Sequence, residues 1–375
     1  MTLVATQPFK GIYVLGALSF EVARFPLFLF KYLLRSGRQH TQWTFRQAIG
    51  VRLFYSVVYH IASIHMTTVL PLTPGTEKER FVLIKPAKNE SYKGPLRSNP
   101  QIKPAEIGAT WYPAPLSVQS DKSNIRVVLH VHGGAFVTGD GRTVASGFMA
   151  KKFLKYSNVT HVLCPQYRLS TLPVSKTSNP FPAALQDTLT SYLWLVNDIG
   201  VSPKDIVVSG DSAGGNLAIS LLRYVAEFGP DLDIPAPSTA LLWSPWINPA
   251  DNSCSYVYDN DHFATDYLSP PFTRWGSTAY AGEAGLETLK QPYISHKDKM
   301  FTTEVPLFVN TGGGEVLYYD NVEWARNMDK AGNNVTLDVE DFVPHDIIVM
   351  GSVLGFNTAA TNCAKRAGEW LRERK

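Results

Sequence analysis

The stretch Ile206-Val-Val-Ser-Gly-Asp-Ser-Ala-Gly-Gly-Asn-Leu217 decides the fold class of this chain. Small or β-branched residues lead into Gly210, and residues 217–228 then have helical composition and apolar spacing. The pattern predicts a buried strand, a sharp turn at Ser212 and a helix that opens at Ala213. Residues 210–214 therefore match G-x-S-x-G between a strand and a helix, the context in which the motif indicates a nucleophile.

The turn at Ser212 would hold a residue other than glycine in a strained conformation, with its hydroxyl above the edge of the sheet. The helix N-terminus behind it would offer unpaired N–H groups and a partial positive charge. The alternative is a turn of glycine and serine without chemistry. The context and the candidate partners of Ser212 favour the nucleophile.

A serine hydroxyl needs a base to accept its proton and a third group to hold that base. His345 lies just after the last predicted strand, and sites form in loops at the carboxyl ends of parallel strands. For the orienting acid we favour Glu315, at a predicted strand-to-helix turn, over Asp320, which lies within the helix. Glu315 could instead be an acid favoured by the dipole of that helix.

Backbone N–H groups are needed to bind the negative charge that develops on an attacked carbonyl. Ala213, next to the nucleophile, offers one such donor. Gly133 and Gly134 follow a predicted core strand, and the missing Cβ atoms allow close approach of a substrate. We therefore expect Gly133, Gly134 and Ala213 to form an oxyanion hole.

Strands and helices are predicted to alternate along the rest of the chain, which indicates a mainly parallel sheet with helices on both faces. The strands are expected at 81–84, 106–112, 126–132, 161–164, 206–209, 240–243, 306–309 and 335–339, and the helices at 143–156, 183–198, 217–228, 317–330 and 358–372. This α/β catalytic domain is expected over residues 67–375. Residues 250–300, rich in Tyr, Asp, Pro and Ser, interrupt the alternation and are interpreted as a cap insertion.

The N-terminal region, residues 1–66, is expected to form apolar helices. Residues 9–34 are strongly apolar, but Glu21, Arg24 and Pro26 interrupt them, and no cleavable signal peptide is expected. Two interpretations remain: a membrane-associating segment, or a pair of helices packed over the active site. A second helix is expected over residues 41–66, starting at Thr41 or Thr44.

The bulk composition excludes some partners. The formal net charge is +3 without a basic block, so nucleic acid is not an implied partner. Cys164, Cys254 and Cys363 are too few and too widely spaced for a disulfide framework or a metal site, and ordinary thiols are expected. His60 and His65 are five residues apart and are interpreted as structural. No metal and no cofactor is predicted, and the oligomeric state stays open.

Several further motifs occur in one order between residues 126 and 346. They are His132–Gly139, Tyr167-Arg-Leu169, Phe181–Asp187, Tyr192–Leu195, Gly210–Leu217, Ser244-Pro-Trp246, Glu315-x-Leu317 and Phe342-x-x-His345. Together they resemble the hormone-sensitive-lipase-like branch of the α/β-hydrolases. The resemblance implies an ester hydrolase with Ser212 as nucleophile, His345 as base, and Gly133, Gly134 and Ala213 as oxyanion donors. It also implies a cap built partly from the N-terminal segment and partly from the insertion after Trp246. Three departures stand out: Glu315 and Asp346, where that family usually has Asp and Gly, and Ala135 for a third Gly.

The expected substrate is a small-molecule ester. The content of 17 Tyr, 19 Phe and 8 Trp and the apolar N-terminus suggest a short acyl group on a bulky lipid, sterol or polyketide-like alcohol. The N-terminus also resembles fungal members near the steryl acetyl hydrolases, which leaves a location at the endoplasmic reticulum membrane or in the cytoplasm. The alternatives are a cyclase, lyase or acyltransferase of the same fold, and a protein that only binds a ligand.

Overall fold

The protein is built on one eight-stranded sheet, seen in a computed structural model that describes residues 3–374. The strand order is β1-β2-β4-β3-β5-β6-β7-β8; β2 is antiparallel to β1 and β4, and all other neighbours are parallel. The strands are β1 Phe81–Ile84, β2 Ile107–Tyr112, β3 Val127–Val131, β4 His161–Gln166, β5 Ile206–Asp211, β6 Thr239–Trp243, β7 Leu307–Gly312 and β8 Val335–Glu340. The predicted α/β fold class is confirmed.

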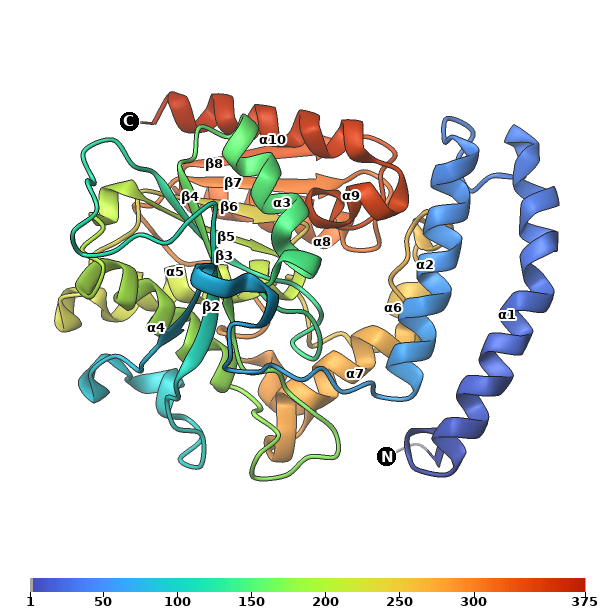
Figure 1. Cartoon of the computed structure of the whole chain (residues 1–375), viewed down its shortest axis with the longest axis horizontal. Helices are drawn as coiled ribbons and strands as arrows, with labels where there is room; N and C mark the ends of the chain where they lie inside the picture. The colour runs from blue at the N-terminus through green and yellow to red at the C-terminus, as the bar shows by residue number, and fades with distance from the viewer. Residues whose placement is uncertain (1–2, 375) are drawn as a thin grey trace.

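Helices cover both faces of the sheet (Figure 1). One face carries α3 (Thr143–Tyr156), α9 (Ile347–Leu354) and α10 (Asn357–Arg372), and the other carries α4 (Ala183–Asn197), α5 (Ser212–Leu232) and α8 (Tyr318–Lys330). With both faces covered, β2 to β7 are buried along almost their whole length, which explains their near-continuous apolar sequence. The short helix α9 was not predicted.

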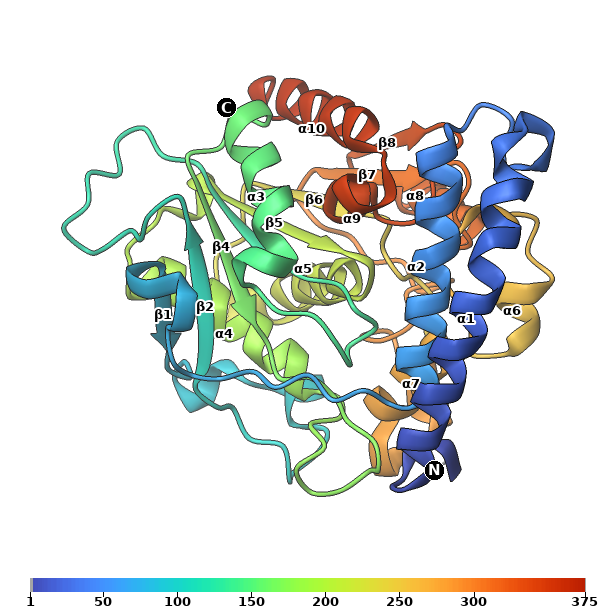
Figure 2. The same ribbon diagram turned by 45° about the vertical axis from the view of Figure 1, so that its right-hand side comes forward.

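Two pairs of helices lie beside the sheet rather than on its faces. The predicted cap segment contains α6 (Cys254–Tyr258) and α7 (Pro270–Ala281). The N-terminal helix α2 (Phe45–Ser63) packs against α7 and α9, and α1 (Phe9–Leu33) packs on the outer side of α2 (Figures 1 and 2). Thr44, one of the two predicted starts, caps α2: its Oγ1 accepts from the Gln47 N–H at 3.3 Å.

Residues 9–34 do not form a pair of helices over the active site, and that interpretation is wrong. They form the single helix α1, which continues through Pro26 and packs on α2. A proline removes only one backbone hydrogen bond, and here uninterrupted helical turns flank it on both sides. By length and composition α1 could cross a membrane, and its most apolar stretch is not buried in the protein.

Candidate active site

Ser212 occupies a strained turn between β5 and α5. Its φ is +51°, a left-handed value that residues other than glycine rarely adopt. Two glycines make the turn possible, because a Cβ on Gly210 would lie 2.2 Å from the carbonyl oxygen of Gly214, and one on Gly214 would lie 2.0 Å from that of Val131. The motif therefore supplies the space that lets the strand and the helix approach each other around Ser212.

His345 lies in the loop between β8 and α9, with Glu315 beside it. The distance from His345 Nδ1 to Glu315 Oε2 is 3.4 Å, and both side chains are buried. Glu315 follows β7 and accepts three hydrogen bonds, from Ser244 Oγ at 2.6 Å, Thr311 Oγ1 at 2.6 Å and Asn321 Nδ2 at 2.9 Å. Donors from separate parts of the chain thus hold this carboxylate in one orientation toward the imidazole.

Asp320, the other candidate acid, faces elsewhere. Its two carboxylate oxygens accept from the Tyr256 hydroxyl and the Lys297 ammonium, each at 2.8 Å. The choice between the two acids follows from helical geometry. Glu315 lies in the turn between β7 and α8 and faces His345, whereas Asp320 lies inside α8 and turns toward the cap.

The electrostatic surroundings of His345 favour its protonated form. Burial alone would lower the pKa of His345, but the neighbouring carboxylates, Glu315 first and then Asp266 and Asp211, raise it above its usual value. A histidine in this setting accepts a proton readily, as a general base must.

Ser212 and His345 line one cavity of about 320 Å³. Among the described residues the side chains of Ser212 and His345 share no direct hydrogen bond; the hydrogen bond of His345 is made by its backbone N–H, to Asp266. Contacts between a nucleophile and its base are often long in unliganded enzymes and tighten when substrate binds. The arrangement therefore brings the predicted nucleophile, base and acid to one edge of the sheet.

The loop predicted to bind the oxyanion passes directly over the turn. A Cβ on Gly133 would lie 3.0 Å from the Ser212 Cβ, and the φ of Gly134 is +100°. The N–H of Gly133 already donates to Asp211 Oδ2 at 2.9 Å. Of the three predicted donors, Gly133 is thus engaged within the protein in this conformation.

Asp211 belongs to a buried polar cluster under this loop. Its Oδ1 lies 2.9 Å from His130 Nε2. Burial by itself would raise the pKa of Asp211, but hydrogen bonds with His130 and Asp346 hold it below its usual value. Burial and the adjacent Asp211 carboxyl conversely raise the pKa of Asp346 well above its usual range, so Asp346 stays protonated and can donate a hydrogen bond.

Asp266 was missed by sequence reasoning. It lies in the predicted cap segment, and its carboxylate accepts the backbone N–H groups of His345 at 3.2 Å and Val316 at 2.7 Å. It thereby links the loop that holds His345 to the turn that holds Glu315. Burial raises the pKa of Asp266 to about 6. An isolated Asp in an irregular segment has no pattern that indicates such a contact.

Two cavities of very different volume adjoin Ser212. A second cavity of only about 10 Å³ is lined by Ala135, Ser212, Trp246, Leu268, Phe272, Thr273 and Leu317. The 320 Å³ cavity extends instead between the oxyanion loop and apolar side chains of α2 and α9, including Phe54, Val58, Ile61, Val349 and Met350. One side of Ser212 therefore has room for about one small group, since a single water-sized probe needs roughly 10–15 Å³.

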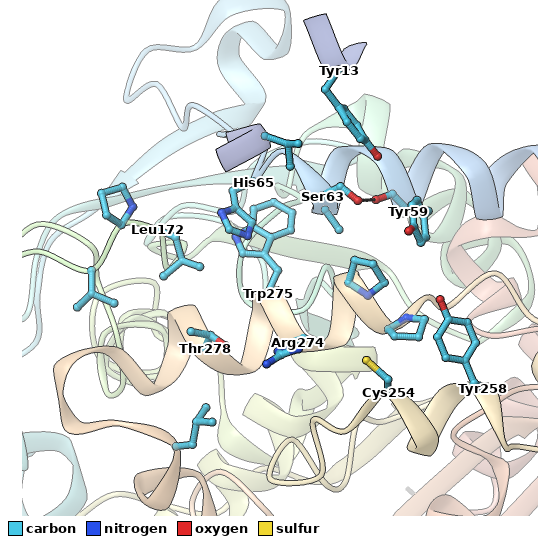
Figure 3. Close-up of a pocket in the computed structure, with 17 residues that line it drawn as sticks. Tyr13, Tyr59, Ser63, His65, Leu172, Cys254, Tyr258, Arg274, Trp275 and Thr278 are labelled. Carbon is cyan, nitrogen blue, oxygen red and sulfur yellow. Dashed lines mark hydrogen bonds between the residues drawn. The ribbon is translucent and has the colours of Figure 1, made fainter. Parts of the chain in front are cut away.

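A larger cavity, of about 990 Å³, lies on the outer side of α7 (Figure 3). Its lining includes Tyr13 from α1, His65 beyond the end of α2, and Arg274 and Trp275 from α7. Neither Ser212 nor His345 reaches it, because α7 presents Phe272 and Thr273 to the opposite side.

The remaining predicted groups behave as structural residues. His60 bonds to the Tyr13 hydroxyl at 2.8 Å, and Cys164, Cys254 and Cys363 are free thiols, as expected. Over residues 3–374, no three His, Cys, Asp or Glu side chains gather where they could hold a metal ion.

A sequence model of the α/β-hydrolase fold matches residues 128–349, more than half of the chain. The chain belongs to this α/β-hydrolase family. It is 27% identical to the esterase LipI of Mycobacterium tuberculosis over 64% of this chain and 72% of that protein. It is 28% identical to an acetyl-hydrolase of Streptomyces hygroscopicus over 59% of this chain and 68% of that relative.

The fold is shared with a solved esterase from the bacterial hormone-sensitive lipase family. The TM-score is 0.62 at 21% identity, and the match covers 88% of this chain and 99% of that structure. The predicted resemblance to the hormone-sensitive-lipase-like hydrolases is confirmed, and so is the prediction of a carboxylesterase-type hydrolase.

Proposed function

We propose that this α/β-hydrolase cleaves carboxylic esters with a small acyl group and a bulky apolar alcohol through an acyl-enzyme. The observation that supports this proposal best is the inequality of the two spaces beside Ser212, about 10 Å³ against about 320 Å³. A small acyl group such as acetyl suits the first space, and an apolar alcohol suits the second. The name of the acetyl-hydrolase relative is in keeping with that choice.

In the proposed reaction Ser212 Oγ attacks the ester carbonyl while His345 accepts its proton. Glu315 holds the imidazole and stabilises the imidazolium, since its carboxylate lies 3.4 Å from Nδ1. His345 then gives the proton to the leaving alcohol, and water releases the acyl group by the same steps. Ser212, His345 and Glu315 thus act as nucleophile, base and orienting acid.

The negative charge on the carbonyl oxygen would be bound by the N–H groups of Gly134 and Ala213. Gly133 was predicted as a third donor. Because its N–H is held by Asp211 at 2.9 Å, we propose that Gly133 mainly fixes the position of the loop. It would join the oxyanion hole only if substrate binding exchanges that bond.

The experiment is a series of p-nitrophenyl esters from acetate to octanoate. We expect kcat/KM to be highest for acetate and to fall steeply beyond butyrate. Ser212→Ala is expected to lower kcat by about 10³-fold or more and to abolish labelling by a fluorophosphonate. Ser202→Ala, an exposed serine close to β5, is the control. Activity that survives Ser212→Ala would contradict the mechanism.

A second variant tests the acyl side alone. Leu268 lines the small cavity, so Leu268→Ala is expected to raise the ratio of octanoate to acetate hydrolysis. Leu286 lines the outer 990 Å³ cavity, and Leu286→Ala should leave the ratio unchanged. An unchanged ratio in Leu268→Ala, with the protein still folded by thermal melting, would place the acyl group elsewhere.

A further inference from the structure

Helix α1 turns its polar side toward the protein and its apolar side outward, the reverse of an ordinary helix on the surface of a soluble protein. Its polar side chains face the protein: the Tyr13 hydroxyl bonds to His60 at 2.8 Å, and Glu21 Oε1 lies 3.4 Å from His60 Nε2 and 3.9 Å from an Arg52 nitrogen. Tyr32, near the C-terminal end, is buried. The contact of α1 with α2 is thus made largely by polar and aromatic groups.

The opposite face of α1 is apolar and exposed along its whole length. Leu15 is 69% exposed, Val22 64% and Phe30 73%. The exposed apolar set also includes Ile12, Leu18, Leu27 and Leu33. A surface helix normally turns such a stripe toward the core, and a continuous exposed patch of this kind marks a surface that meets lipid or another protein.

The charges on and next to α1 indicate which of the two it meets. Between residues 9 and 38 the basic residues are Lys10, Arg24, Lys31, Arg35 and Arg38, and the single acid is Glu21. Glu21 faces α2, whereas Lys31 and Arg35 are exposed. The exposed apolar face thus lies next to two exposed basic groups at and just beyond the C-terminal end of α1, and the combination is complementary to an anionic lipid surface.

We propose that α1 is an in-plane membrane anchor, whose apolar face lies in the interface of an anionic bilayer while its polar face stays on α2. The apolar face of α1 thus contacts lipid, and the helix lies parallel to the membrane surface rather than across the bilayer. This proposal does not depend on the ester hydrolysis proposed above, because it concerns a different face of the molecule.

The in-plane orientation follows from the contacts that α1 would lose by crossing. A helix of 25 residues is about 37 Å long, enough to span a bilayer, so its length does not decide the orientation. Crossing would place Glu21 and Arg24 near the centre of the hydrocarbon, where charged groups are costly. It would also strip Glu21 and Tyr13 of their partners on α2.

The link between α1 and α2 is tied to the body of the protein as well. The Arg38 guanidinium donates to the carbonyl oxygens of Tyr32 at 2.9 Å and Trp43 at 2.7 Å. Trp43 Nε1 in turn donates to the carbonyl of Phe342, at 2.5 Å, in the loop that holds His345. Because α2 lines the active-site cavity with Phe54, an in-plane α1 would hold that cavity one helix away from the lipid.

The first experiment measures binding of the full chain to phosphatidylcholine vesicles with and without phosphatidylserine. We expect co-sedimentation that is stronger with phosphatidylserine and that Leu15→Glu/Leu18→Glu weakens by about tenfold or more. The control Val118→Glu/Gln119→Glu makes the same charge change on an exposed loop and should bind normally. Ser212→Ala should also bind normally, which separates this proposal from the catalytic one.

The second experiment distinguishes the two orientations in the membrane. Cys254 is the exposed thiol, and Cys164 and Cys363 are buried, so Cys254→Ser gives a background for labelling. A fluorophore is attached to single cysteines at Ile12, Val22 or Leu33, all exposed on α1, and quenched by lipids with nitroxides at different depths. We expect the same shallow depth at all three positions.

Two outcomes would overturn the proposal. A deep Val22 between shallow Ile12 and Leu33 would show that α1 spans the bilayer. No binding to either kind of vesicle, together with a dimer in sedimentation that Leu15→Glu/Leu18→Glu dissociates, would show that a second copy covers the apolar face. Thermal melting of each variant, Ser212→Ala included, verifies that it is folded.

Discussion

Two buried carboxyl sites flank His345, and they differ in what surrounds them. Glu315 receives three hydrogen bonds, from Ser244, Thr311 and Asn321. Asp346 instead lies against the carboxyl of Asp211, and its pKa is raised well above the usual range by burial and by that neighbour. Side chains of the same chemical type, at the same edge of the sheet, thus have different hydrogen-bonding roles.

Both carboxyl groups are buried, so burial does not explain the difference. The hydrogen-bond donors around each group decide whether it can act as an acceptor beside the imidazole. With three donors, Glu315 remains an acceptor that can face His345 Nδ1. Asp346 has the Asp211 carboxyl as its neighbour, and this contact and burial raise the pKa of Asp346, which favours its protonated form. The Asp211 carboxylate in turn accepts the N–H of Gly133 at 2.9 Å.

The largest expected effect is on kcat and comes from removing the negative charge of Glu315. Glu315→Gln should lower kcat by about 10³- to 10⁴-fold, the scale seen when the acid of such a triad is made an amide. Since Glu315 raises the pKa of His345, its loss should lower that pKa. The base is active when neutral, so the acidic limb of the pH–kcat profile should move to lower pH.

The control for this change is Asp320→Asn, the acid that faces Tyr256 and Lys297, which should leave the profile in place. A profile unmoved in Glu315→Gln, or shifted equally in Asp320→Asn, would show that Glu315 is not the acid that acts on His345.

A smaller effect on kcat is expected from changing Ser244, which contacts both Glu315 and Asp346. Ser244 Oγ donates to Glu315 at 2.6 Å and accepts from the N–H of Asp346 at 3.2 Å. Ser244→Ala should lower kcat about tenfold with KM nearly unchanged, because one buried hydrogen bond to a charged group is worth about 1.5–3 kcal/mol. Steady-state kinetics on p-nitrophenyl acetate measure both constants.

Ser277→Ala is the matched control, since Ser277 is equally buried but bonds to the carbonyl of Pro249. If Ser244→Ala raises KM and leaves kcat intact, Ser244 contributes to substrate binding rather than to the orientation of Glu315.

The smallest expected effect is on the stability of the folded protein, through the ionisation of Asp346. In the unfolded chain Asp346 ionises near pH ~3.9, whereas the folded protein keeps it protonated to much higher pH. A raised carboxyl pKa favours the folded state at low pH, and this contribution is lost as pH rises through the folded pKa. Asparagine does not ionise, so the stability of Asp346→Asn does not fall with pH in this way. The φ at position 346 is +52°, a value that Asn tolerates.

Thermal melting of both proteins between pH 4 and 8 tests this sign. We expect the Tm of Asp346→Asn relative to the unmodified protein to rise with pH, by about 1–2 °C for each pH unit above the pKa of Asp346 in the unfolded chain. A Tm difference that is constant over this range would mean that Asp346 ionises in the folded protein as it does in the unfolded chain.

Much of the architecture and of the candidate site could be predicted because its information is local. The alternation of strands and helices predicted the sheet, and the predicted strands differ from the observed ones only at their ends. Ser212, Glu315 and His345 each follow a strand, and parallel strands bring their carboxyl ends to one edge. For the same reason Glu315 could be preferred to Asp320.

The sequence by itself determined the sheet, the turn at Ser212 and the apolar character of residues 9–34, because these depend on neighbouring residues and their period. Only the tertiary structure decided that Asp266 joins the His345 and Glu315 loops, that Gly133 is bound to Asp211, and that α1 turns its polar side inward. Such contacts join residues far apart in the chain. Their distances and partners depend on how separate elements pack, which no local pattern encodes.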